Sequence, residues 1–188
     1  LFIYPGKRRI DTGDGDDELV LRGGLAGSLI TTGAGNDMVL SRDPYRSGPM
    51  TLRLQDGDDT FGCTGVACGG ASQIYGGPGT NKLDLWEAIP AVTAVLGPLG
   101  SLVIHGGDGD RSLAVFDFVD ITTGDGDDDI TGSDGDNEFL TRDGDDTINA
   151  LGGDDVIAAE GGADSADGGI GDDQCYGVES PTNCETVG

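Results

Sequence analysis

Acidic side chains recur at a fixed interval between Thr123 and Tyr176, where the sequence divides without insertion into the nine-residue units TGDGDDDIT, GSDGDNEFL, TRDGDDTIN, ALGGDDVIA, AEGGADSAD and GGIGDDQCY. Position four is Gly in every unit. Position six carries a side-chain oxygen throughout: Asp128, Asn137, Asp146, Asp155, Asp164 and Asp173. Several anionic oxygen ligands suit calcium, whereas magnesium demands a tight octahedron and keeps its waters. The pattern therefore predicts calcium binding.

The elements that position these side chains are short turns and short strands. Gly at positions two and four permits a tight turn with positive φ. Positions seven to nine then form a strand whose position eight points inward, at Ile130, Phe139, Ile148, Ile157, Ala166 and Cys175. Two units make one coil, so units stack in two rows, one of Asp128, Asp146 and Asp164 and the other of Asn137, Asp155 and Asp173. An ion between coils would offset the repulsion of the stacked carboxylates.

These units resemble the calcium-binding nonapeptide repeat of RTX (hemolysin-type) proteins, G-G-x-G-x-D-x-U-x, over Thr123 to Tyr176. The resemblance implies an all-β fold, a right-handed parallel β-roll or β-solenoid. It also implies that position-six carboxylates and backbone carbonyls hold Ca²⁺ between successive turns. Asn137 departs from the acid of the motif, so we expect weaker sites there.

The motif continues at wider spacing before Thr123, in TGDGDDELV, TGAGNDMVL, LQDGDDTFG and GGPGTNKLD. Position six becomes Asp17, Asp37, Asp59 and Asn81, which predicts one calcium-type turn per coil of about 20–22 residues and one continuous calcium row. In HGGDGDRSL the alignment is ambiguous between Arg111, which cannot bind a cation, and Asp110, which we prefer. Further candidate metal ligands are the position-three carboxylates Asp14, Asp56, Asp125 and Asp143.

The overall charge excludes several function classes. The chain has 188 residues, 35 acidic and 10 basic, and a formal net charge of -25. Such a chain repels nucleic acid and anionic membrane surfaces, and it has no apolar stretch long enough to span a bilayer. Disorder is the competing interpretation of this composition, but periodic acids favour a fold that forms with calcium.

The four cysteines predict two local disulfides in an oxidising compartment, since no His or further Cys lies near either pair to form a zinc site. We pair Cys63 with Cys68, which would close an irregular turn. We also pair Cys175 with Cys184, and we expect Cys184 to point inward from the facing sheet so that the bond crosses the core. That loop of about ten residues contributes roughly 2–3 kcal/mol on the chain-entropy model. Two unpaired buried thiols are the alternative.

We expect a single β-solenoid domain over 1–188, with irregular coils over 1–122, the regular β-roll over 123–176 and a C-terminal cap over 177–188. The segment 85–100, LWEAIPAVTAVLGPLG, lacks the motif and is expected to be an irregular coil with a loop. The N-terminal LFIY is either a first strand that covers the core or an arm that pairs with a neighbouring subunit.

The sequence favours a secreted calcium-binding structural module, extracellular or at the cell surface, that binds roughly six to nine Ca²⁺ ions and belongs to a surface or matrix assembly. The alternative is a homo-oligomer, a subunit that polymerises end to end into an extracellular filament. No catalytic motif is present, and the periodicity explains the paired carboxylates without catalysis, so we do not expect an enzyme.

Overall fold

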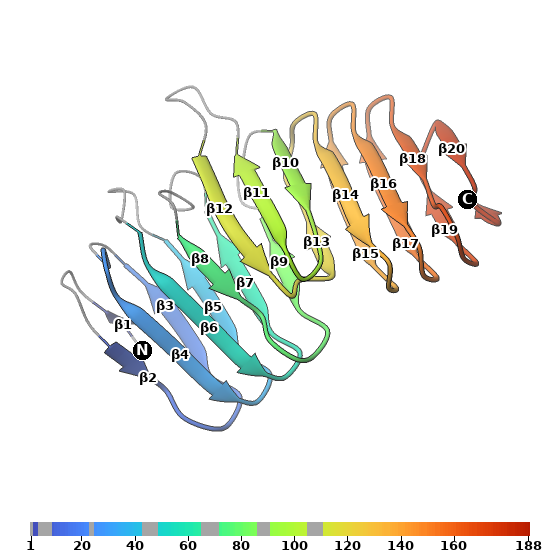
Figure 1. The fold of residues 1–188 in the computed structure, drawn as a ribbon. Coiled ribbons are helices and arrows are strands. Elements are labelled where there is room, and N and C mark those ends of the chain that lie inside the picture. The colour runs from blue at the N-terminus through green and yellow to red at the C-terminus, as the bar shows by residue number, and fades with distance from the viewer. Residues whose placement is uncertain are drawn as a thin grey trace.

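The computed structural model describes residues 2–3, 9–22, 25–42, 49–64, 72–85, 91–104 and 111–188. Its described elements are all β-strands, and they wind into a parallel β-solenoid with two facing sheets (Figure 1). This confirms the predicted fold class. No helix in the described part of the chain is both long and apolar enough to cross a membrane.

The first sheet has ten strands in the order β1 (Phe2–Ile3), β3 (Glu18–Leu21), β5 (Met38–Ser41), β7 (Thr60–Cys63), β9 (Lys82–Asp84), β13 (Asp120–Thr122), β15 (Glu138–Asp143), β17 (Val156–Gly161), β19 (Gln174–Tyr176) and β21 (Thr186–Val187). The second has eleven strands in the order β2 (Arg9–Asp11), β4 (Leu29–Ala34), β6 (Thr51–Asp56), β8 (Gln73–Tyr75), β12 (Arg111–Phe116), β11 (Gly100–Ile104), β10 (Val92–Val95), β14 (Asp129–Ser133), β16 (Thr147–Leu151), β18 (Ser165–Asp167) and β20 (Ser180–Thr182).

Successive coils stack in a register that follows the spacing of the sequence motif. Backbone contacts between neighbouring turns link residues 20 or 22 apart in the N-terminal coils and 18 apart in the nonapeptide region. Within the N-terminal coils and within the nonapeptide region, each coil therefore brings its position-six residue beside that of the next coil. This stacking turns a linear repeat into rows of aligned side chains.

A narrow apolar core lies between the two sheets, because alternate strand residues point inward. Position eight supplies this core in the nonapeptide region, as predicted, and its residues are fully or almost fully buried. Leu19, Val39, Phe61 and Leu83 continue the same inner face through the N-terminal coils.

The structure corrects the expectation for residues 85–100. Val92–Val95 and Gly100–Ile104 are strands, not parts of an irregular coil, and they form an antiparallel meander with β12. The alternation of buried and more exposed side chains along VTAV is the strand signal, but the calcium motif is absent there. Residues 86–90 lie outside the described part of the chain.

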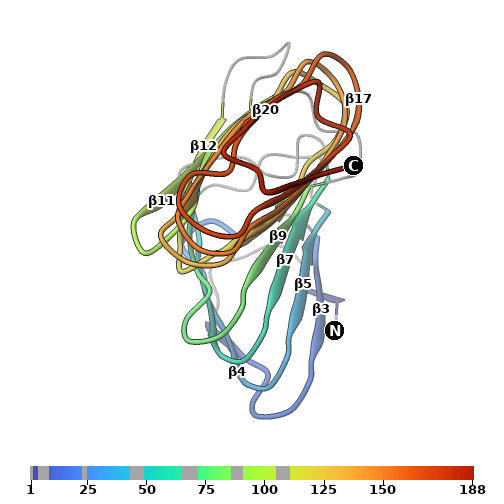
Figure 2. The same ribbon diagram turned by 90° about the vertical axis from the view of Figure 1, so that its right-hand side faces the viewer.

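This meander widens only one sheet. In the second sheet β11 and β10 lie between β12 and β14, whereas in the first sheet β13 alone separates β9 from β15. Two extra strands add roughly 10 Å to one side of the stack. The coils before and after the meander must therefore fan apart, and Figure 2 shows the yellow-to-red coils tilted relative to the blue-to-green ones.

The two ends of the stack differ. At the N-terminal end, Phe2 and Ile3 form β1 and pair in parallel with Val20 and Leu21 of the same chain. This pairing agrees with a first strand. At the C-terminal end the coil shortens, because Ser165 pairs with Ser180 in one sheet and Gln174 pairs with Thr186 in the other.

Glycine is required where a carbonyl of one coil lies against the backbone of the next. A Cβ atom built on Gly33, whose φ is +105°, would collide with the carbonyl oxygen of Gly13 in the preceding coil. Gly13 itself has a φ of +90°, but a Cβ atom there would have no neighbour within 4 Å. Positive φ alone explains Gly13, whereas coil stacking also excludes a side chain at Gly33.

We therefore expect Gly33→Ala to destabilise the calcium-loaded protein more than Gly13→Ala does. Both variants strain a left-handed backbone by about 1–2 kcal/mol, and only Gly33→Ala adds an overlap, worth about 1–3 kcal/mol more. Urea unfolding in saturating calcium measures both. Equal losses from the two variants would contradict a role for close coil stacking.

Candidate metal centre

The turns between the sheets form two rows along the solenoid. The first turn row leads from the second sheet to the first and carries Asp17, Asp37, Asp59, Asn81, Asn137, Asp155 and Asp173 just before the strands of the first sheet. The second turn row leads in the opposite direction and carries Asp128, Asp146 and Asp164. The structure thus places the position-six residues of both halves of the chain in common rows.

In seven of the eight position-six aspartates of the described residues, Oδ1 accepts a hydrogen bond from the backbone of the adjacent coil or, at Asp128, from the N–H of Val92. The backbone N–H of Asp17 donates to Oδ1 of Asp37 at 2.8 Å, and that of Asp128 donates to Oδ1 of Asp146 at 2.8 Å. The same bond recurs at Asp59, Asn81, Asp155, Asp164 and Asp173. These bonds fix the rotamer of each carboxylate and align the row.

The other carboxylate oxygen has no hydrogen-bond partner. Among the described residues, Oδ2 is buried and without such a partner in eight position-six aspartates: Asp17, Asp37, Asp59, Asp128, Asp146, Asp155, Asp164 and Asp173. A buried anionic oxygen without a partner is expensive, so native structures supply a partner or an ion. Its recurrence along both rows fits a cation bound between neighbouring coils.

Two position-six residues are amides, and both face the same turn. The amide Nδ2 of Asn81 donates to the carbonyl oxygen of Asp117 at 3.0 Å, and Nδ2 of Asn137 donates to the carbonyl oxygen of Val119 at 2.7 Å. The turn Asp117–Val119 contains no Gly-Asp motif. Asn thus replaces Asp where the second side-chain atom, Nδ2, must donate a hydrogen bond to a carbonyl. The series of position-six carboxylates in the first turn row is interrupted here, contrary to the continuous calcium row that we predict from spacing.

Backbone carbonyls point along the stack beside these carboxylates. A Cβ atom on Gly57, Gly144 or Gly171 would collide with the carbonyl oxygen of the position-four glycine in the preceding coil. The oxygens concerned include those of Gly35, Gly126 and Gly153. Carbonyl and carboxylate oxygens together are the ligand set that Ca²⁺ takes. The residues present therefore fit this ion.

The pKa of Asp59, Asp128 and Asp155 is raised to about 6, mainly by burial and in smaller part by the negative charge of the position-six carboxylate in an adjacent coil. Burial likewise raises the pKa of Asp146. Ionisation of these carboxyl groups is therefore less favourable in the folded protein than in an exposed side chain. A cation between the coils would offset this effect.

The position-three candidates Asp14, Asp56, Asp125 and Asp143 have exposed side chains. In the described part of the chain no group of three or more Asp, Glu, His or Cys side chains converges on one point. The position-three carboxylates are thus not gathered with neighbouring position-six pairs, and each cation site would depend mainly on two carboxylates and on carbonyl oxygens. Asp110 lies outside the described residues.

Sequence reasoning missed a second series of hydrogen bonds at position five. Oδ1 of Asp16 accepts from the N–H of Asn36 at 2.9 Å, and Oδ1 of Asp127 accepts from the N–H of Asp145 at 3.0 Å. The direction is opposite to that at position six, where the N–H belongs to the preceding coil. The sequence does show Asp or Asn at position five in most turns, which could have indicated this role. These side chains connect neighbouring coils by accepting a backbone N–H from the following coil.

Two glutamates outside the motif were also missed. Oε2 of Glu179 accepts from the N–H of Asp164 at 2.8 Å, and Oε2 of Glu185 accepts from the N–H of Asp173 at 2.7 Å. They occupy the places of position-six carboxylates in the C-terminal coil. No repeat signal could reveal them, because that coil is shorter.

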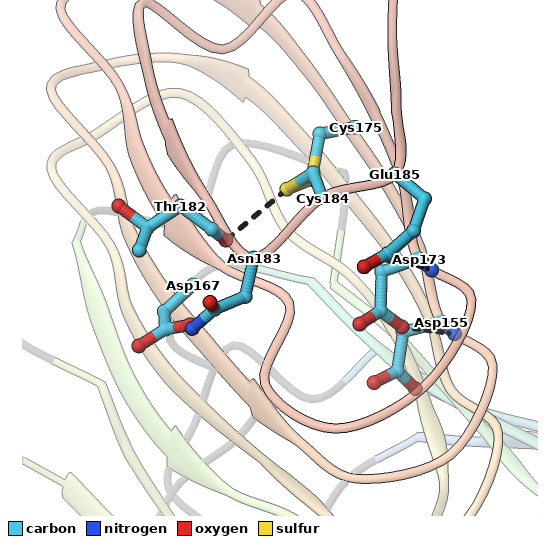
Figure 3. The surroundings of a disulfide bond; sticks show 8 residues. All are labelled: Asp155, Asp167, Asp173, Cys175, Thr182, Asn183, Cys184 and Glu185. Atoms are coloured by element: carbon cyan, nitrogen blue, oxygen red, sulfur yellow. Dashed lines mark hydrogen bonds between the residues drawn. A yellow bond between two sulfur atoms is a disulfide. The ribbon is translucent and has the colours of Figure 1, made fainter.

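The Cys175–Cys184 disulfide is present, with Cα atoms 5.9 Å apart (Figure 3). Its geometry corrects our expectation: Cys184 lies in the turn after β20, not in a strand of the facing sheet, because the last coil omits residues. Cys63 is buried and disulfide-bonded, while its predicted partner Cys68 lies outside the described residues.

Comparison with known families bears on the same residues. The family model described as RTX calcium-binding nonapeptide repeat (4 copies) matches residues 122–157 and 140–175. Residues 122–175 are RTX calcium-binding repeats. The match confirms the resemblance and includes the position-six residues from Asp128 to Asp173. The N-terminal turns lie outside the match but have the same position-six hydrogen bonds as the matched turns. None of the curated proteins compared with the chain matches it.

The amide positions can be tested by exchanging the two residue types in adjacent coils. We expect Asn137→Asp to reduce the folded fraction of the calcium-free protein, because a carboxylate oxygen would replace the donor to Val119 at a cost of about 1–3 kcal/mol. The matched variant Asp155→Asn should act in the opposite direction, because it removes a buried charge. Circular dichroism and urea unfolding after chelation at neutral pH measure both, and a change of the same sign would contradict the assignment.

The raised pKa values predict an unusual pH dependence. The folded-state pKa of about 6 at Asp59, Asp128 and Asp155 exceeds the ordinary 3.8. Their contribution to the calcium-free fold is therefore complete below pH 3.8 and is lost as pH rises through about 6.

Without calcium, acidification from neutral pH through this window should increase stability, and the extra stability due to calcium should shrink because the ion needs ionised carboxylates. Urea midpoints with and without calcium across this range test this. A calcium-free fold that loses stability on acidification through pH 6 would show that the position-six carboxylates do not dominate the titration.

Proposed function

We propose that this chain is a secreted structural module whose folding is driven by Ca²⁺ ions bound between stacked turns. The observation that carries the proposal is the set of eight buried position-six Oδ2 atoms without hydrogen-bond partners, aligned in rows beside glycine carbonyls. An ion that binds only the stacked coils stabilises the folded state through its binding free energy.

The sites that we propose lie between neighbouring position-six residues. Among the described residues, five neighbouring pairs consist of two aspartates: Asp17 and Asp37, Asp37 and Asp59, Asp128 and Asp146, Asp146 and Asp164, and Asp155 and Asp173. The pairs that include Asn81 or Asn137 have one carboxylate and should bind more weakly. A total of roughly six to nine ions therefore requires sites in addition to these five pairs.

An extracellular setting supports such a module on two grounds. Extracellular calcium is at millimolar concentration, which suffices for weak sites, whereas cytosolic calcium does not. The Cys175–Cys184 disulfide also persists in oxidising compartments and is rare in the cytosol. We therefore place the module outside the cell, as part of a surface or matrix assembly.

Calcium titration of the chelated chain is the direct test. We expect chelation at neutral pH to reduce the strand signal in circular dichroism strongly and to leave a minor folded fraction, because the stacked carboxylates of a chain with net charge -25 then repel one another without compensation. Calcium should restore the signal cooperatively, and magnesium at equal ionic strength should restore much less of it. A chelated chain that is already fully folded and does not respond to calcium would overturn the proposal.

Light scattering on the same samples separates a module from a filament subunit. Because β1 pairs with β3 of its own chain, we expect a monomer in calcium at all protein concentrations. Calcium-dependent growth of particle size, abolished by removing residues 1–5, would instead favour the filament alternative.

A further inference from the structure

Both turn rows finish on a glutamate of the C-terminal coil. Glu179 follows Asp164 in the second turn row, and Glu185 follows Asp173 in the first. The sequence separations of these pairs are 15 and 12, whereas position-six pairs in the nonapeptide region are separated by 18. The coil that carries the glutamates is therefore shorter, and the longer side chain of Glu reaches the place that Asp occupies elsewhere.

The hydrogen bond of each glutamate matches that of an interior position-six carboxylate, although the side chains of Glu179 and Glu185 are exposed. Each glutamate accepts the backbone N–H of the preceding position-six aspartate through one oxygen, as the interior aspartates do. The side chains of Asp164 and Asp173 are 1% and 0% exposed, and their Oδ2 atoms have no hydrogen-bond partner. An unpartnered buried oxygen thus lies beside each terminal glutamate, as it does in the interior pairs.

The disulfide holds the segment that carries both glutamates. The bond from Cys175 to Cys184 closes a loop that contains Glu179, and Glu185 directly follows Cys184. Cys175 is anchored in the core on β19, two residues after Asp173. Figure 3 shows Glu185 and Asp173 stacked beside the bond, with Asp155 next in the row. The disulfide therefore restricts the backbone of the segment that carries Glu179 and Glu185.

We infer that Glu179 and Glu185 complete two terminal calcium sites, with Asp164 and Asp173 respectively, and that the Cys175–Cys184 disulfide preorganises both. This inference rests on the proposed function. It makes the C-terminal end of the stack sensitive to the redox state of this disulfide. By linkage, calcium at these sites opposes reduction of the disulfide by the same factor that the disulfide increases calcium affinity.

The test is the equilibrium fraction of this bond that is reduced in the full chain, in buffers of reduced and oxidised dithiothreitol with and without millimolar calcium. Two electrons and two protons convert the disulfide to two thiols, and the reagent is oxidised to its cyclic disulfide. Alkylation and mass spectrometry of the C-terminal peptide separate Cys175 and Cys184 from the other two cysteines. We expect calcium to lower the equilibrium constant for reduction at least about fivefold, the lower end of typical coupling between sites.

The variants Glu179→Gln and Glu185→Gln keep an oxygen that can accept the backbone N–H but remove the charge. Each should lose part of the calcium protection and lower the affinity of one ion roughly tenfold or more, as loss of a supporting group does at metal sites. Asp37→Asn is the matched control: it removes a carboxylate from sites remote from the disulfide and should leave the protection unchanged. Cys184→Ser should weaken the terminal ions while Cys175 remains in the core.

Calorimetric titration with calcium and circular dichroism on the same variants separate the two ideas. If the wild-type chain folds with calcium but both glutamate variants keep full stoichiometry and full protection, the terminal sites are wrong and the proposed function stands. If the wild-type chain binds no calcium, the proposed function itself fails.

Discussion

The stacking of buried carboxylates one coil apart is the constraint on which the rest of this structure depends. Among the described residues, each of the eight position-six aspartates leaves Oδ2 buried without a hydrogen-bond partner, and in seven of them Oδ1 accepts a backbone N–H from another part of the stack. Such an arrangement is unfavourable in an apolar environment unless a cation compensates it. The acidic composition is therefore not only a property of the surface, because part of the charge lies at the edge of the core.

Other features of the turns follow from the same close stacking. Glycine at position four lets a carbonyl of one coil approach the backbone of the next, where any side chain would collide. The hydrogen bonds of position five run opposite to those of position six, so each turn is held from both directions. Asn replaces Asp at the two places where Nδ2 donates to a carbonyl of a motif-free turn. The residue type thus follows the partner that each coil presents.

The solenoid is interrupted in the middle and closed at its C-terminal end. The antiparallel strands β10 to β12 widen one sheet at the level where the first turn row lacks a carboxylate, so the two stretches of calcium-type turns in that row are separated. At the C-terminal end, the shortened coil, the disulfide and two glutamates replace the repeat. The β10–β12 insertion and the shortened C-terminal coil both lie where a turn no longer stacks on another turn of the same kind.

The sequence by itself determined the repeat, the inward position eight, the parallel coils and the alignment of position-six residues, because a fixed period with fixed Gly, Asp and aliphatic positions admits one way of stacking. Only the tertiary structure decided what happens where the period fails. The pairing of β10 with β14, the common turn faced by Asn81 and Asn137, the place of Cys184, and the roles of Glu179 and Glu185 depend on neighbours that no local pattern specifies. A repeat predicts its own contacts, whereas an insertion or an end acquires its contacts from whichever coil lies beside it.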